Sequence, residues 1–113
     1  MTTTLKISTE FSDTPGPRYK SEGAHSGEEF RTNILSRMVR DAIQSGDTLV
    51  IDLDGVQGYG TSFLEESFGG LIRDDKLDYN DIVRHIEIIS NEEPYLKDDI
   101  EGYLKDASDE AEK

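Results

Sequence analysis

The sequence predicts a small α/β protein whose mainly parallel or mixed sheet has helices packed on it. Two apolar runs, at 48–53 and 85–90, have the composition of buried parallel strands. Residues at helical spacing flank both runs, and such alternation favours right-handed crossovers between neighbouring strands. A chain of 113 residues fits one domain. We expect that domain over residues 1–107, followed by a charged tail at 108–113 that frays.

The N-terminal segment is predicted to begin with a strand. Leu5 and Ile7 alternate with polar neighbours, and this pattern predicts a short strand over residues 3–9. The run SDTPGPR at 12–18 holds two prolines around a glycine and predicts a turn. Residues 18–25 suit either a short edge strand or a loop, and the sequence leaves both open.

A long amphipathic helix is predicted over residues 27–45. Ser26 and Glu29 have the S-x-x-E spacing of a capping box, and Gly46 supplies a stop signal. Between these signals the apolar residues recur at helical spacing: Phe30, Ile34, Leu35, Met38, Val39, Ala42 and Ile43.

A second helix is predicted over residues 62–73. Ser62 and Glu65 again have the spacing of a capping box. One face of this helix is apolar and consists of Leu64, Phe68, Leu71 and Ile72. Gly69 and Gly70 weaken a helix by roughly 1 kcal/mol each relative to alanine, so we expect them where the helix lies close to the sheet.

The last third of the chain is predicted to contain a connection, a strand and a helix. Residues 73–84 are polar with isolated apolar positions, which indicates a connection with one helical turn at 79–83. The strand at 85–90 follows, and Pro94 suits the first turn of a final helix. The apolar face of that helix would comprise Leu96, Ile100, Tyr103, Leu104 and Ala107.

The charge of the chain is strongly negative and unevenly placed. The formal net charge is −13, and residues 47–113 carry all of it, because six basic and six acidic groups cancel in residues 1–46. Such a surface repels phosphate backbones, so we expect no nucleic-acid binding. It favours a basic protein partner or serves solubility.

Several other classes of protein are disfavoured by composition. The chain has no cysteine, which excludes disulfides and thiolate metal sites. No apolar run approaches the ~18 residues of a membrane span, and the N-terminus lacks the features of a signal peptide. A cytoplasmic protein without membrane association is therefore expected. His25 and His85 lack ligand-like spacing, so structural roles are expected for both.

The residues after the strand at 48–53 are the main functional candidates, because such residues gather at the carboxyl ends of parallel strands. The stretch DGVQGYGTS, at 54–62, combines three glycines with the hydroxyl pair Thr61 and Ser62. A cap at Ser62 would contribute about 1 kcal/mol and explains most of this stretch. A cap at Ser62 does not explain the second hydroxyl, on Thr61. We consider three interpretations of this hydroxyl pair: a helix cap, a phosphate-accepting switch and part of an active site.

The active-site interpretation comes from a short motif. VIDLDG, at 50–55, resembles the first motif of the haloacid-dehalogenase phosphatases. That resemblance implies Asp52 as nucleophile and Asp54 as general acid. The family also needs a later lysine and a strand-end acidic pair for magnesium, whereas the run KDD at 97–99 falls inside a predicted helix. We therefore expect no enzyme activity, no catalytic residue, no metal and no cofactor.

Three segments together resemble the bacterial STAS-like domains, relatives of the sulfate-transporter and anti-sigma-factor-antagonist domains. The segments are SGEEFRTNIL, LVIDLDGVQGYGTSFLEESFGGLIR and HIEIISNEEPYLKDDIEGYL. The similarity extends over roughly residues 18–107. It implies a regulatory protein–protein interaction domain, and Arg18-Tyr19 resembles a recurring pair of the family without an assigned role.

The resemblance also implies a phosphorylation site. In STAS antagonists, the second of two hydroxyl residues at a helix start is phosphorylated by a partner kinase of the histidine-kinase-like ATPase class. By position, Thr61 matches the first hydroxyl and Ser62 the second. Ser62 is thus the implied phosphoacceptor, with Thr61 as the neighbouring candidate. Gly60 stands where the family has aspartate, and Phe63 where it has glycine.

A surface around the start of this helix is the implied partner-binding site. It comprises Gly58, Tyr59, Gly60, Phe63, Glu65 and Glu66. We expect the Phe63 ring to be exposed there, because aromatic side chains are enriched at interfaces. The alternative is an adaptor or ligand-binding domain that uses the same fold without phosphorylation.

Overall fold

The computed structural model describes residues 2–112 and contains a sheet of three parallel strands. In the order in which they lie, the strands are β1 (Thr2–Lys6), β2 (Thr48–Asp52) and β3 (Ile86–Ile89). Leu5 lies opposite Ile51, which in turn lies opposite Ile88. These three side chains are buried on the sheet face that the helices cover. The predicted α/β class is confirmed, with both strand pairs parallel.

The first long helix is built from three consecutive pieces, here called together the α2–α3 helix. They are α2 (Gly27–Phe30), a π-type turn (Arg31–Leu35) and α3 (Ser36–Ser45). The Ser26 hydroxyl accepts a hydrogen bond of 3.0 Å from the Glu29 N–H, as the predicted cap requires. Gly46 ends the helix in the left-handed conformation, with φ of 72°. Both predicted boundaries are confirmed.

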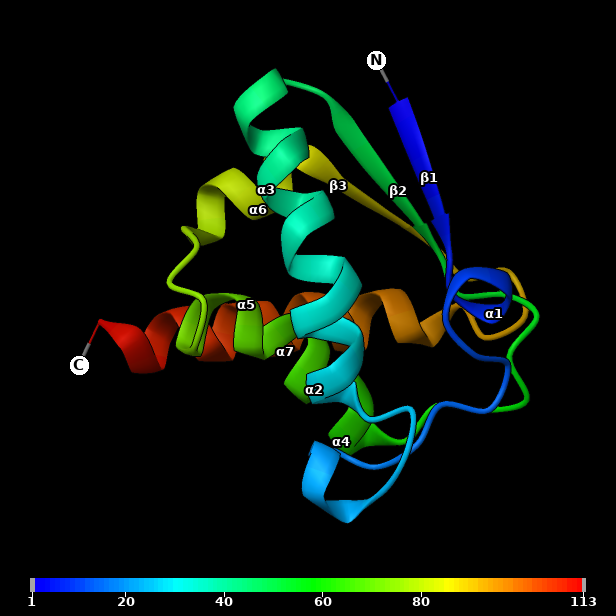
Figure 1. Cartoon of the computed structure of the whole chain (residues 1–113). Helices are drawn as coiled ribbons and strands as arrows, with labels where there is room; N and C mark the ends of the chain where they lie inside the picture. Colours follow the sequence, from blue (N-terminus) through cyan, green and yellow to red (C-terminus); the bar gives the residue numbers. More distant parts are fainter. Residues whose placement is uncertain (1, 113) are drawn as a thin grey trace.

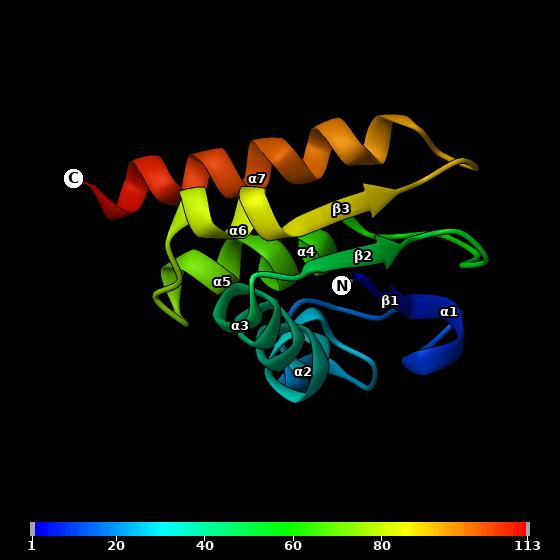
Figure 2. The same ribbon diagram turned by 90° about the horizontal axis from the view of Figure 1, so that it is seen from above.

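The second long helix, here called the α4–α5 helix, also contains a π-type turn. Its pieces are α4 (Thr61–Leu64), the turn (Glu65–Gly69) and α5 (Gly70–Arg73). Two further helices complete the chain, α6 (Tyr79–His85) and α7 (Tyr95–Ala111). Figures 1 and 2 show the α4–α5 helix between the α2–α3 helix and α7, with contacts to both.

Close packing of the two long helices requires a glycine. A Cβ atom on Gly27 would lie 2.6 Å from the Phe63 carbonyl oxygen and 3.2 Å from the Phe63 Cα. Because both neighbours are backbone atoms, neither can move aside without shifting a helix. Phe30 and Phe63, each fully buried, stack beside this crossing with ring centroids 5.8 Å apart.

The structure corrects one prediction for the N-terminal segment and decides between the two alternatives left open for another. The strand predicted over 3–9 ends at Lys6, and a helical turn, α1 (Ile7–Glu10), replaces its second half. The Glu10 carboxylate accepts a hydrogen bond of 2.7 Å from the Lys6 N–H, which turns the chain where β2 also ends. Between 18 and 25 the structure has no strand, and the 3₁₀ turn η1 (Lys20–Glu22) lies there.

Two helices are longer than predicted. The helical turn expected at 79–83 is part of α6, which begins after a cap in which the Asp78 carboxylate accepts from the Asp81 N–H at 3.2 Å. The helix after Pro94 continues to Ala111, so residues 108–111 are helical where a frayed tail was predicted. Lys113 lies outside the described residues.

The glycine at the helix crossing generates a stability prediction. We expect Gly27→Ala to lower the free energy of unfolding by about 1–3 kcal/mol, because the added methyl group meets backbone atoms on the facing helix. Gly102→Ala is the matched control. Gly102 is exposed on α7 with no atom near its added Cβ, so this change should stabilise by about 0.5–1 kcal/mol. Urea unfolding measures both, and equal effects would show that the crossing is not tightly packed.

Candidate functional site

The loop after β2 is held by the aspartates of the D-x-D-G motif. The Asp52 carboxylate accepts a hydrogen bond of 2.9 Å from the Asp54 N–H. Its other oxygen lies 3.3 Å from the Lys6 ammonium group, which also donates to the Asp54 carbonyl at 3.4 Å. Asp52 therefore closes a turn and pairs with a neighbouring strand.

Asp54 joins this loop to the loop after β3. Its carboxylate accepts from the Glu92 N–H at 3.0 Å, and the Glu92 carboxylate accepts from the Gly55 N–H at 2.7 Å. Gly55 has φ of 89°, a conformation that glycine adopts without strain. Both aspartates thus have structural partners.

Within residues 2–112, no group of three or more histidine and acidic side chains is arranged to hold a metal ion.

Tyr59 fastens the glycine-rich part of the loop to the sheet. Its hydroxyl donates a hydrogen bond of 2.8 Å to the Leu53 carbonyl, and its ring lies 6.1 Å from that of Phe63. Burial raises the pKa of Tyr59, and the carboxylates of Asp52 and Asp54 raise it further. The hydroxyl therefore stays protonated and keeps its role as donor.

The predicted cap at Ser62 is absent because the helix starts earlier. Gly60 is the N-cap residue of α4, with extended backbone angles and no capping side chain. Ser62 is the second helical residue, and its side chain is exposed beside Thr61. The Glu65 carboxylate contacts arginines and not the backbone at the helix start. The expected Ser62–Glu65 capping box is therefore wrong.

Phe63 is buried, contrary to the expectation of an exposed docking ring. Its exposed fraction is 0%, and its ring contacts the rings of Phe11, Phe30 and Tyr59. The third position of this helix faces the α2–α3 helix, where Gly27 makes room for it. Phe63 belongs to the hydrophobic core and cannot meet a partner in this conformation.

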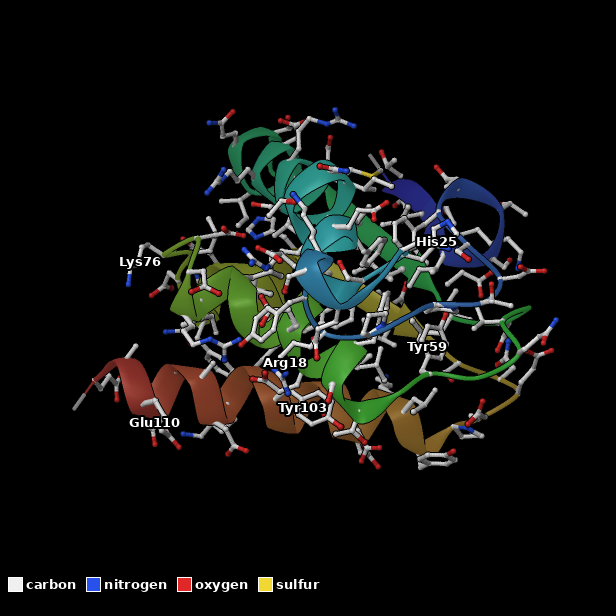
Figure 3. The ribbon with its side chains drawn as sticks, turned by 60° about the horizontal axis from the view of Figure 1, so that its bottom comes forward. Arg18, His25, Tyr59, Lys76, Tyr103 and Glu110 are labelled. Atoms are coloured by element: carbon white, nitrogen blue, oxygen red, sulfur yellow. The ribbon has the colours of Figure 1, made fainter. Side chains whose placement is uncertain are left out.

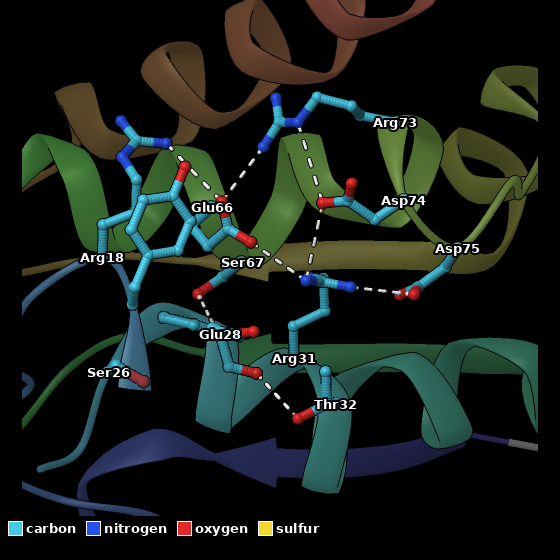
Figure 4. Close-up of polar contacts among 12 residues, drawn as sticks. Arg18, Ser26, Glu28, Arg31, Thr32, Glu66, Ser67, Arg73, Asp74 and Asp75 are labelled. Carbon is cyan, nitrogen blue, oxygen red and sulfur yellow. Dashed lines mark hydrogen bonds and ion pairs between the residues drawn. The ribbon is translucent and has the colours of Figure 1, made fainter. Parts of the chain in front are cut away.

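Glu66 is also buried, and it occupies the centre of an arginine cluster. Its carboxylate lies 2.9 Å from Arg31, 3.2 Å from Arg73 and 3.7 Å from Arg18, and its side chain is 3% exposed. Figure 4 shows the three guanidinium groups approaching Glu66 from different elements. Charge balance in the core explains this position, because a buried carboxylate without partners would be costly.

Arg31 extends the cluster towards the end of α5. Its guanidinium group lies 2.8 Å from the Asp75 carboxylate, and its exposed fraction is 5%. Burial alone would lower the pKa of Arg31, but hydrogen bonds with Asp75 and Glu66 raise it, so the group stays charged. A Cβ on Gly70 would overlap the Arg31 side chain. Gly70 thus makes room for this arginine and not, as predicted, for the sheet.

Glu65 lies at the surface edge of the cluster and binds two arginines. Arg73 donates to it at 2.9 and 3.3 Å, and Arg18 donates to one of the same oxygens. Burial alone would raise the pKa of Glu65, but the hydrogen bonds from Arg73 and Arg18 lower it below its ordinary value. Half-buried Glu65 can therefore reach a partner only at the rim of the cluster.

An open groove lies at the other end of the same helix. It has a volume of about 470 Å³ and runs between α5 and the last turns of α7. Lys76 and Glu110 stand on its opposite sides in Figure 3. Of the predicted partner-binding residues, Glu65 alone lines this groove. The predicted surface and the groove therefore share Glu65 and no other residue.

Sequence reasoning missed the arginine cluster altogether. The detectable signal was Arg31, which is in phase with Leu35 on the apolar stripe of a predicted helix. An arginine at such a position needs an acidic partner in the core. The second signal was the Gly69-Gly70 pair: Gly70 leaves space for Arg31 of the α2–α3 helix, and Gly69 leaves space for Glu65 of its own helix.

The family comparison decides the class of the domain. Residues 26–96, more than half of the chain, match the family model described as "STAS-like domain of unknown function (DUF4325)". The chain belongs to this family. The matched part of this STAS-like domain contains β2, β3 and both long helices. The resemblance seen in the sequence is thus confirmed. Comparisons with curated proteins and with solved structures found no match.

One further property concerns membranes. Among residues 2–112, no helix has both the length and the apolar composition that a membrane span requires.

The two serines at the helix starts give a matched test of capping. We expect Ser26→Ala to lower the free energy of unfolding by about 1 kcal/mol or more, because Ser26 is a buried cap. Ser62→Ala should change it by less than about 0.5 kcal/mol, because Ser62 is exposed and caps nothing. Thermal and urea unfolding measure both. A clear loss for Ser62→Ala would mean that its hydroxyl caps the helix in solution.

The Glu65 cluster predicts a pH dependence of stability. Since the pKa of Glu65 is lowered in the folded state, its stabilising contribution is complete above the ordinary value of 4.5 and is lost below it. Glu65→Gln should destabilise by about 1–2 kcal/mol at pH 7, and the difference from wild type should shrink below pH 4.5. Glu101→Gln, at an exposed position of α7, is the charge-matched control and should show no such difference. A constant difference across pH would contradict the ion pairing.

Proposed function

We propose that this STAS-like domain is a non-catalytic regulatory module that binds a protein partner at its loop–helix surface. This surface comprises Gly58, Tyr59, Gly60, Thr61, Ser62 and Glu65. One observation carries the proposal. Thr61 and Ser62 are exposed, whereas residues 66–72 of the same helix are all buried. The α4–α5 helix can thus meet a partner through its first turn, which is where STAS antagonists are regulated.

The glycines of the loop support the same surface. Neither Gly58 nor Gly60 has a positive φ, and a Cβ on either would meet no atom within 4 Å. The fold therefore requires glycine at neither position. A partner whose backbone approaches the loop closely would require small residues there, and so would an induced change in loop conformation.

Ser62 is the phosphoacceptor that we propose, with Thr61 as the neighbouring alternative. Ser62 corresponds to the modified hydroxyl of STAS antagonists, and its exposure leaves it accessible to a kinase. The proposed partner is an ATPase of the histidine-kinase-like class. It would transfer the γ-phosphoryl group of ATP to the Ser62 oxygen and release ADP and the hydroxyl proton. The phosphate would add about −1.5 to −2 charges beside the partner.

Charge supports a protein partner with a basic surface. The net charge of −13 opposes nucleic-acid binding and favours contacts that weaken as salt rises. The proposed function requires neither a metal ion nor a cofactor. Asp52 and Asp54 hold the loop in place through Lys6 and Glu92, which gives them a role without phosphatase chemistry.

A non-phosphorylated adaptor is the second candidate function. Gly60 favours it, because STAS antagonists have aspartate at that position. Such an adaptor would use the same loop–helix surface, and its binding would be insensitive to charge at Ser62.

The proposal predicts how charge at Ser62 acts on a partner captured from the native host by affinity pull-down. Ser62→Asp should change the dissociation constant at least tenfold, about 1.4 kcal/mol, while the protein melts like wild type. Asn33→Asp adds one charge at another exposed helix position and should leave the constant unchanged. Calorimetry measures binding, and Thr61→Ala should bind normally.

Intact-mass measurement on protein from its host completes this test. One phosphate on Ser62 is the expected result. Unmodified protein, together with normal binding by Ser62→Asp, would favour the adaptor. A phosphate on Thr61 would mean that the alignment with the STAS turn is off by one residue.

A further inference from the structure

Arg18 lies beside the two glutamates that follow Ser62 by one helical turn. Its Nη1 atom donates to the Glu65 carboxylate and lies 3.7 Å from that of Glu66. Residues three and four apart on a helix are surface neighbours, about 5–6 Å apart at their Cβ atoms. Glu65 and Glu66 stand at these two spacings from Ser62. The Arg18 guanidinium group therefore contacts the two side chains that lie one helical turn beyond Ser62.

Most of the hydrogen-bonding capacity of Arg18 is unused. A guanidinium group has five N–H donors, and Nη1 makes the contacts with Glu65 and Glu66. Among residues 2–112, the side-chain hydrogen bonds and ion pairs of Arg18 are made by Nη1, its guanidinium group lies 6.0 Å from the centroid of the Tyr19 ring, and its side chain is 28% exposed. Arg18 can thus accept another anion at the surface, and its planar fork suits two phosphate oxygens.

Glu65 does not depend on Arg18 for charge compensation. Arg73 binds both of its oxygens, at 2.9 and 3.3 Å. If Arg18 turned away, Glu65 would keep a two-point contact with a cation. Glu66 would likewise keep Arg31 at 2.9 Å and Arg73 at 3.2 Å. Release of Arg18 leaves no unpaired carboxylate in the cluster.

We infer that Arg18 is an internal receptor for a phosphate on Ser62, and that it exchanges Glu65 for this phosphate. The inference rests on the phosphorylation of Ser62 that we propose above. Without a cation between them, a phosphate at Ser62 and the Glu65 carboxylate would repel each other across one helical turn. Arg18 is placed to remove this repulsion, and Arg73 keeps Glu65 neutralised.

The exchange would change the loop–helix surface beyond the phosphate itself. Arg18 lies at the base of the α2–α3 helix, where its carbonyl accepts a hydrogen bond of 2.9 Å from the Glu28 N–H. The adjacent Pro17 carbonyl accepts from the Gly27 N–H, also at 2.9 Å. With its backbone fixed in this way, Arg18 changes partner by a movement of its side chain. The phosphorylated surface then carries a phosphate–arginine pair in place of an arginine–glutamate pair.

The test uses protein with phosphoserine incorporated at position 62 during synthesis, titrated by ³¹P NMR. We expect the second pKa of the phosphate to be lower by about 0.5 or more than in a phosphoserine peptide of residues 58–66. Arg18→Gln should remove this lowering. Arg37→Gln, the matched control, removes a guanidinium group from an exposed position of α3 and should leave the lowering unchanged.

Two results would overturn the inference. One is a phosphate pKa in the wild-type chain equal to that of the peptide. The other is a lowering that persists in folded Arg18→Gln, which would mean that the helix backbone alone binds the phosphate. If Arg18→Gln does not fold, the wild-type chain provides the test. The NMR chemical shift of the Arg18 Nε–H must then change when Ser62 is phosphorylated, and an unchanged shift would contradict the inference.

The titration also separates this inference from the proposed function. It needs neither a kinase nor a partner, because the phosphate is installed during synthesis. If protein from the host carries no phosphate on Ser62, the proposed phosphorylation is overturned. The effect of Arg18 on a phosphate installed at Ser62 can still be measured. A peptide-like pKa would overturn the role of Arg18 and leave phosphorylation in the host to be decided by mass measurement.

Discussion

The buried carboxylate of Glu66 is the constraint on which the arrangement of the long helices depends. It lies between the α2–α3 helix and the α4–α5 helix, and Arg31 and Arg73 both contact it. A buried ion pair of this kind adds little net stability, but loss of one partner leaves a charge in the core. The pairing thus specifies how the helices meet. Gly70 contributes by leaving the space that Arg31 fills.

This constraint also bears on the surface that we propose for partner binding. Ion pairs hold the α4–α5 helix on one side, and Phe63 and Phe68 anchor it in the core. Its first two residues, Thr61 and Ser62, are exposed, and the loop before them is fastened at Tyr59 and open at Gly58 and Gly60. The start of this packed helix therefore presents the Ser62 hydroxyl to solvent. The Ser62 hydroxyl lies one helical turn before Glu65 and Glu66, the two carboxylates that bind the arginines.

The D-x-D-G motif shows how context decides the role of acidic residues. Asp52 and Asp54 follow a central strand, as a catalytic pair would, yet their carboxylates bind loop N–H groups and the Lys6 side chain. The reciprocal bonds of Asp54 and Glu92 with backbone N–H groups join the loops after β2 and β3. These bonds hold the end of the sheet from which the loop–helix surface projects.

By itself, the sequence determined the α/β class, both central strands, the cap at Ser26 and the stop at Gly46, because each depends on near neighbours in the chain. It did not determine the surroundings of the α4–α5 helix. The Ser62–Glu65 spacing satisfies a local capping rule, but Glu65 turns to Arg73, at the end of its own helix, and to Arg18, from a distant part of the chain. Phe63 is likewise buried by a helix more than thirty residues away in sequence. Tertiary structure decided these roles, because the direction of a charged or aromatic side chain follows the partners that it meets in the fold, and Arg18 and the α2–α3 helix are distant in sequence.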